Sequence, residues 1–350
     1  MEFVPIRTKR AGRSRGADGF PHPCGTGRAD PSFDPGSFAL TLLDVIESPD
    51  YRPPILPPIA TELLALATRV DVDLDEIVPL VERDGWFAVR LRAAASAEAR
   101  ATGVKLGSLR QVCLYFGLLQ IRDLVIEESV ADCVFLGDAH QDTMNGLRRH
   151  SLATGHLARS LAECSSVASE LAYVAGLLHD VGIAGVLHVL TERDIELGPL
   201  PPPSVLWPAI ERIHGRVGAI MARHWGFAPE IALAIEVHHD QPAGLDASPL
   251  AAALSIASEL AHHEGFGLAE VALDGSGRDS ARGADESSSA EPTELGPKED
   301  GAPSTRVPAT VLDRQLSLLG LERSSLHLIA HRARRALRDI DEASGTGEAG

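Results

Sequence analysis

Aromatic residues are scarce in this 350-residue chain, at 4%, and its four cysteines form no CxxC pair. With so few rings, the core must consist mainly of leucine, alanine, valine and isoleucine, which favours packed helices over a sandwich of strands. The cysteine spacing indicates neither a zinc ribbon nor a thioredoxin-like redox site. Short β-branched alternations bounded by turns, which are typical of strands, are also missing from the sequence. We therefore expect an all-α fold.

Basic residues are outnumbered by acidic ones, 32 against 49, which gives a formal net charge of −17. A nucleic-acid-binding protein needs basic surface to neutralise phosphates, so this balance argues against broad contact with DNA or RNA. One basic run, RTKRAGRSR at residues 7–15, leaves a nucleic-acid-binding arm as a minor alternative. A solvated tail is the more ordinary state of such a run.

No apolar signal-peptide core accompanies the Arg-rich N-terminus, so the sequence predicts a cytoplasmic protein. The most apolar stretch, LAYVAGLLHDVGIAGVLHVL at residues 171–190, carries Asp180 and two histidines. A charge at the centre of a bilayer costs at least ~2.5 kcal/mol on insertion scales. We therefore interpret this stretch as buried protein core and expect no membrane span.

Glycine, proline and apolar residues are distributed unevenly, and their distribution divides the chain into helical and low-complexity segments. The predicted segments are a disordered tail at 1–36, a first helical lobe at 37–142, a second helical lobe at 143–271, a disordered acidic insert at 272–306, closing helices at 307–342 and a final tail at 343–350. We expect the insert to be a spacer, because no apolar anchor interrupts it.

Histidines lie on the inward faces of four predicted helices in the second lobe, spaced three or four residues from apolar neighbours. They are His150, His179, His214 and His238. A single histidine on an apolar face is ordinarily a core residue bonded to backbone, and that interpretation or simple exposure fits His156, His188, His224 and His327. Four inward rings together with a buried acid indicate a shared cation site instead.

Two adjacent pairs, His179–Asp180 and His238–His239, restrict where such a cation can lie. Neighbouring residues on a helix point about 100° apart, so both members of a pair reach one ion only over the seam between them. A carboxylate can bridge two cations, whereas a neutral imidazole supplies one nitrogen to each. Gly176 and Gly182 bracket the first pair and remove side-chain bulk there.

These motifs resemble those of the HD superfamily, in the same order: RRHSLATGHLARSLA, AYVAGLLHDVG, ERIHGRVGAIMARHWGF and IEVHHD. The first lobe, with LPPIATELLALATRVDVDLDEIVPLVERDGWFAVRLRAAA, more closely resembles the HDOD domain, an HD-related signalling output domain. The resemblance runs from about residue 38 to residue 265, and LGLERSSLHLIAHRARRAL resembles the closing helix. It implies a two-lobed all-α bundle of the HDOD/HD-like type.

HD phosphohydrolases use the matching positions to hold one or two divalent metals that activate water against a phosphoester. The resemblance therefore implies a metal site made by His150, His179, Asp180, His214, His238 and His239. Asp180 is the implied catalytic residue if turnover remains. Imidazole and carboxylate ligands suit iron, manganese, zinc or nickel.

The sequence departs from the pattern of active cyclic-dinucleotide hydrolases in three places. Ile183 replaces a lysine expected after HDVG, Ser258 replaces a closing aspartate, and DQPAGLDAS replaces the GYP-type segment. The first change removes a phosphate-binding cation and the second removes a metal ligand.

Two functions therefore stay open. HDOD domains are viewed as non-catalytic relatives, so we expect a bacterial regulatory protein that contacts signalling proteins in trans and retains a divalent metal site. The alternative is a metal-dependent phosphohydrolase acting on a nucleotide or cyclic dinucleotide. The cations available to it on the relevant helices are Arg149, Arg212, Arg216 and Arg223.

Overall fold

A computed structural model describes residues 34–67, 72–135, 140–192, 203–239, 248–268 and 309–345. Within these ranges every regular element is a helix, which confirms the predicted all-α class. The predicted insert at 272–306 and nearly all of the predicted tail at 1–36 lie outside the described residues. The predicted domain boundaries stay predictions.

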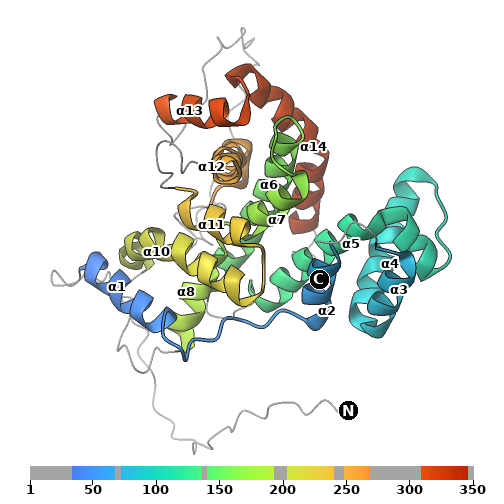
Figure 1. Cartoon of the computed structure of the whole chain (residues 1–350), viewed down its shortest axis with the longest axis horizontal. Helices are drawn as coiled ribbons and strands as arrows, with labels where there is room; N and C mark the ends of the chain where they lie inside the picture. The colour runs from blue at the N-terminus through green and yellow to red at the C-terminus, as the bar shows by residue number, and fades with distance from the viewer. Residues whose placement is uncertain are drawn as a thin grey trace, which may run out of the picture.

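The described residues of the first half of the chain form five helices, four of which gather into one lobe (Figure 1). Their bounds are α1 Pro35–Ile46, α2 Pro58–Ala67, α3 Leu74–Arg83, α4 Gly85–Thr102 and α5 Leu109–Cys133. Asp73 begins α3 with a capping box to Glu76, as its spacing in the sequence predicts. Ser108 and Gln111 form a second capping box at the start of α5.

The second half forms the larger lobe and the closing helices (Figure 1). Its elements are α6 Gln141–Ala162, α7 Ser169–Leu178, α8 Val181–Glu192, α10 Pro203–His224, α11 Pro229–Val237, α12 Pro249–Ala261, the π-helix η2 His262–Phe266, α13 Ala309–Leu319 and α14 Arg323–Gly345. Helix α6 packs on α7, α12 and α14, while α10 packs on α8 and α11. Helix α1 leaves the other N-terminal helices and lies against α10.

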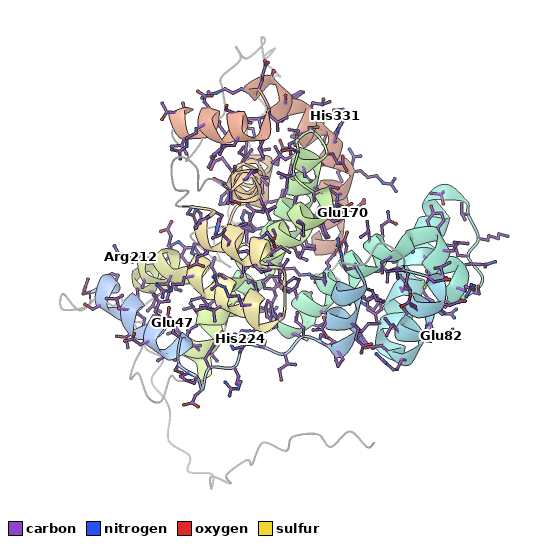
Figure 2. The ribbon with its side chains drawn as sticks, in the orientation of Figure 1. Glu47, Glu82, Glu170, Arg212, His224 and His331 are labelled. Atoms are coloured by element: carbon purple, nitrogen blue, oxygen red, sulfur yellow. The ribbon has the colours of Figure 1, made fainter. Side chains whose placement is uncertain are left out.

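A buried ion network joins the two lobes where α5 meets α6 and α7. The Asp123 carboxylate accepts hydrogen bonds from Arg122 and from Arg159 of α6. The Tyr173 hydroxyl of α7 donates to Glu127 at 3.1 Å. The contacts of Arg159 with Asp123 and of Tyr173 with Glu127 therefore link α6 and α7 to α5 at the junction. Figure 2 labels Glu82 on the first lobe and His331 on α14, which lie at separate corners of the molecule.

The apolar stretch at Ser169–Thr191 is long and hydrophobic enough to cross a membrane by length and composition alone. In the structure, 89% of its most apolar window is buried inside the protein. It forms α7 and α8, which meet at a corner made by His179 and Asp180. The interpretation of this stretch as buried core is therefore confirmed.

Candidate metal centre

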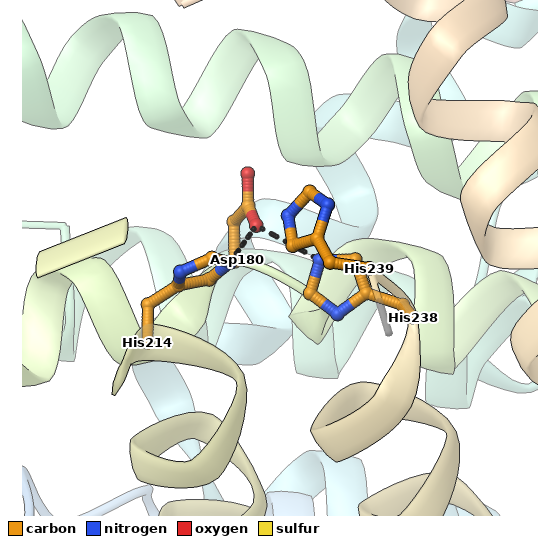
Figure 3. A group of neighbouring side chains, drawn as sticks. All are labelled: Asp180, His214, His238 and His239. Atoms are coloured by element: carbon orange, nitrogen blue, oxygen red, sulfur yellow. Dashed lines mark ion pairs between the residues drawn. The ribbon is translucent and has the colours of Figure 1, made fainter. Parts of the chain in front are cut away.

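The six predicted site residues converge at one place in the second lobe. His150 comes from the middle of α6, and His214 from α10. His179 and Asp180 form the corner between α7 and α8, while His238 and His239 directly follow α11. Figure 3 shows Asp180 between His214 and His238, with His239 alongside.

The Asp180 carboxylate lies at the centre of the cluster, and each of its oxygens faces two imidazoles. Oδ2 lies 3.3 Å from Nε2 of His179 and 3.6 Å from Nε2 of His150. Oδ1 lies 3.3 Å from Nε2 of His214 and 3.5 Å from Nε2 of His238. All five side chains are buried. The carboxylate therefore belongs to two groups of ligand atoms, and within each group all the atoms lie within 4.8 Å of one another. It can bridge two cations.

Backbone carbonyls fix the orientation of the four buried rings. Each Nδ1 lies 2.7–2.9 Å from a main-chain oxygen, and those oxygens belong to Phe266, Gly176, Glu211 and Ile235. A carbonyl only accepts, so each Nδ1 carries the proton and donates it. Every Nε2 then carries the lone pair, and that of His150 lies 3.3 Å from Ser258 Oγ. Metal-binding histidines have this arrangement, in which the second nitrogen fixes the tautomer.

Four buried polar atoms in the centre have no hydrogen-bond partner among the described residues. They are Nε2 of His179, His214 and His238, and Oδ1 of Asp180. The contacts of 3.3–3.6 Å between Asp180 and the four rings lack hydrogen-bond geometry at these atoms. An unpaired buried polar atom is costly, and a cation relieves several at once. The donor set therefore fits a divalent transition metal.

The electrostatics of the cluster favour a neutral His150 and an ionised Asp180. Burial acts to lower the pKa of His214, but its contact with the Asp180 carboxylate raises that pKa above its usual value. Burial, together with the neighbouring His179 ring, lowers the pKa of His150 to about 3. Burial acts to raise the pKa of Asp180, but the charge of His179 and contacts with His214 and His238 hold it well below its usual range. An ionised acid thus lies beside a neutral imidazole, as metal binding requires.

Two predicted ligands occupy less central positions. His239 lies at the exposed outer edge, with its ring 4.0 Å from the His238 ring and 5.0 Å from that of His214. His150 is engaged on both nitrogens, because Ser258 Oγ lies 3.3 Å from its Nε2. Ser258 thus faces the centre at the place where the sequence pattern expects an aspartate.

The sequence analysis did not identify His262, whose ring lies 4.6 Å from that of His150. Ser258, His262 and Phe266 recur every four residues and form one face of α12 and η2 toward His150. The i, i+4 spacing from Ser258 is the sequence signal that identifies this position.

Two glycines allow the helices around the centre to approach backbone to backbone. A Cβ on Gly182 would lie 1.9 Å from the His214 carbonyl oxygen, so α8 touches α10 there. A Cβ on Gly176 would lie 2.8 Å from the Cα of Gly155, so α7 touches α6. These contacts bring Asp180 and His179 within reach of rings on two other helices.

A cavity of about 120 Å³ opens over the centre. Its described lining contains no lysine or arginine and consists of Asp180, Ile183, Trp207, Glu211, His214, His239, Ser258, His262 and Leu268.

The four arginines considered for phosphate binding make other contacts. Arg216 pairs with Glu47, and Arg223 pairs with Glu236. Arg212 lies beside the first turn of α1, as Figure 2 shows. The Arg149 guanidinium lies 5.0 Å from the centre of the Phe266 ring.

The model of the HDOD domain family matches residues 54–241, slightly more than half of the chain. No curated protein matches the chain.

Several solved structures share the fold. An HDOD domain protein of unknown function from Geobacter sulfurreducens aligns with a TM-score of 0.55 and 22% identity, over 88% of this chain and 97% of its own. A Shewanella amazonensis protein provisionally named a metal-dependent phosphohydrolase aligns with a TM-score of 0.53 and 21% identity, over 65% of this chain and 83% of its own. A Marinobacter aquaeolei protein provisionally named a signal transduction protein aligns with a TM-score of 0.55 and 18% identity, over 90% of this chain and 66% of its own.

Proposed function

Because the chain belongs to the HDOD domain family, we propose that it is a regulatory protein of bacterial signalling that acts through protein contacts and holds a divalent metal at its buried histidine–aspartate centre. The observation that carries the metal part is the set of unsatisfied ligand atoms aimed at one point. Signalling or regulatory proteins in trans are the partners that we propose.

The centre offers separate ligands to two ions. Asp180, His214, His238 and His239 would hold one, and His150, His179 and Asp180 would hold the other. A bound divalent metal would supply positive charge and, in an active relative, an activated water. The protein's own contribution is to present neutral imidazoles in fixed tautomers around one ionised carboxylate.

Three observations favour a regulator over a phosphohydrolase. The described lining of the cavity lacks a cation that would hold a phosphate. Ile183, in place of the expected lysine, is a buried apolar side chain. The cavity volume of about 120 Å³ is below the roughly 300–1,000 Å³ that is usual for small-molecule sites. The alternative function remains a metal-dependent phosphohydrolase, favoured by the retained ligand set.

Metal analysis of the purified full chain tests the first part of the proposal. We expect iron, manganese, zinc or nickel near stoichiometry, and a lower melting temperature after treatment with a chelator. The double variant His179→Ala/Asp180→Ala should lose the metal. The control His224→Ala removes a histidine that contacts the Ile220 carbonyl instead, and it should retain the metal. Wild-type protein without metal, and with a melting temperature indifferent to chelators, would refute the metal site.

A turnover screen tests the second part. The metal-loaded protein is incubated with phosphomonoesters and phosphodiesters, including cyclic di-GMP, with added manganese or iron. We expect no hydrolysis above that of the His179→Ala/Asp180→Ala variant. Turnover that disappears in this variant would support the phosphohydrolase and overturn the non-catalytic function.

A further inference from the structure

The two groups of ligand atoms in the centre define two ion positions that differ in depth. The outer position, drawn in Figure 3, is formed by Asp180, His214, His238 and His239. The inner position is formed by His150, His179 and Asp180. His214 and His239 line the cavity over the centre, so the outer position opens to this cavity. His150 and His179 are completely buried and absent from its described lining.

The polar atoms without a hydrogen-bond partner are divided unequally between the two positions. Among the described residues, the outer position has three of them, which are Nε2 of His214, Nε2 of His238 and Oδ1 of Asp180. The inner position has one that belongs to it alone, Nε2 of His179. A cation at the outer position therefore relieves more unsatisfied atoms than a cation at the inner position.

His150, the remaining ligand of the inner position, already has a hydrogen-bond partner at each ring nitrogen. Its Nδ1 donates to the Phe266 carbonyl, so its Nε2 carries the lone pair. The Ser258 hydroxyl lies 3.3 Å from this Nε2 and donates to it. Because a metal needs the same lone pair, an ion at the inner position has to displace the Ser258 hydroxyl.

Charge separates the two positions further. Asp180 supplies the only carboxylate in the two groups of ligand atoms, so two divalent ions would share one negative charge. Glu211 is the other acid in the described lining of the cavity, and it belongs to neither group. Ser258 is uncharged where the sequence pattern expects an aspartate. Two buried ions repel each other strongly, so the first ion weakens binding of the second.

We propose that the outer position keeps a resident divalent ion, whereas the inner position is a regulatory site for a second, exchangeable divalent ion that displaces the Ser258 hydroxyl from His150. This inference rests on the proposed metal centre. Ser258 lies on α12 and His150 on α6, so occupancy of the inner position changes a contact between these two helices. The free concentration of the metal then sets the fraction of molecules in which that contact is broken.

Titration of the metal-free full chain with Zn²⁺, in competition with chelators of graded affinity, tests the inequality. We expect two ions per chain, with dissociation constants about a hundredfold or more apart. His150→Ala should remove the weak step and leave the tight one. His238→Ala should weaken the tight step by at least about tenfold, and the control His224→Ala should keep both steps.

Substitution of Ser258 tests the inner position without removing a ligand, so it decides the proposal even if His150→Ala fails to fold. Ser258→Asp should lower the dissociation constant of the second step at least about tenfold, whereas Ser258→Asn, of similar size but uncharged, should not. Nitrogen-15 NMR of the imidazoles follows the displacement. The Nε2 signal of His238 should shift in the first step and that of His150 in the second.

The outcomes separate this inference from the metal centre on which it rests. Two steps of equal affinity, or a weak step that persists in His150→Ala, would overturn the unequal positions. A single ion that stays single at millimolar Zn²⁺ would overturn the exchangeable ion and leave the proposed metal centre standing. No bound ion at all would refute both.

Discussion

Substitution of Gly182 by alanine tests the close approach that assembles the centre. The added Cβ would meet the His214 carbonyl oxygen at 1.9 Å and the Gly218 nitrogen at 2.5 Å. Both atoms belong to the backbone of α10, so no side chain can turn away. Ordinary van der Waals contact begins at 3.4 Å, so α8 must move from α10 by about 1.5 Å, the difference between 3.4 and 1.9 Å.

The cost of this displacement is large for a single methyl group. Overpacking a core typically costs about 1–3 kcal/mol of stability. We expect a cost near the upper value here, because the clash can be relieved only by moving one helix away from the other. A loss of about 3 kcal/mol lowers the melting temperature of a domain of this size by roughly 6–12 °C. The movement also separates Asp180 from His214, now 3.3 Å apart, so we expect metal affinity to fall at least tenfold.

Two other glycines provide matched controls for Gly182→Ala. In Gly185→Ala the new Cβ would meet the Met221 Sδ at 2.5 Å, and a flexible thioether can move aside at a cost below about 1.5 kcal/mol. In Gly85→Ala it meets nothing within 4 Å, so that variant should be at least as stable as the wild type.

Guanidinium denaturation of the metal-free variants and chelator competition for Zn²⁺ give the two measurements. Gly182→Ala with the stability and affinity of Gly85→Ala would refute the reasoning.

Three further variants probe the centre, the second lobe and the lobe junction. Ser258→Asp adds a carboxylate at the centre and should tighten Zn²⁺ binding at least tenfold in chelator competition, whereas Ser258→Ala should not. Burial lowers the pKa of His156 to about 4 from its ordinary 6.5, so its contribution to stability is complete above pH 6.5. Up to about 3 kcal/mol should be lost as pH falls toward 4, and denaturation of His156→Leu across this range should show a flatter profile. Asp123→Ala leaves the buried Arg122 without its carboxylate and should cost about 3–5 kcal/mol in urea denaturation, against under about 1 kcal/mol for the surface-paired Asp75→Ala. Equal losses for these two aspartate variants would contradict a buried junction.

The sequence predicted the inward faces of the helices because burial follows the helical period. His150 and His214 lie inside, at the positions that their apolar neighbours indicate. The apolar run at residues 171–190 forms two helices, α7 and α8, which end and begin on either side of the His179–Asp180 pair. Because the residues on both sides of this corner are apolar and buried, the hydrophobic pattern does not predict the change in chain direction.

Other features were beyond sequence reasoning for equally physical reasons. The π-helix at His262–Phe266 changes the residue period after His262, so the α-helical period could not place the residues that follow it. The apolar face of α1 predicts a buried contact without naming its partner, and the structure places it on α10. Chain order suggested instead that α1 belongs to the first lobe.

The centre has an energetic consequence that bears on its role. Each buried polar atom without a partner costs about 1–3 kcal/mol, and Asp180 and three histidines contribute four such atoms. Their sum is a sizeable part of the roughly 5–15 kcal/mol that stabilises a folded domain. Apolar residues of similar volume are often neutral or stabilising in place of buried charges, so a scaffold alone gains nothing from this cluster. This free-energy cost is offset only when a cation binds to those atoms. Ile183 and the rest of the described cavity lining include, in contrast, no lysine or arginine that could hold a phosphate. We therefore propose that the centre retains a metal without recognising a phosphate.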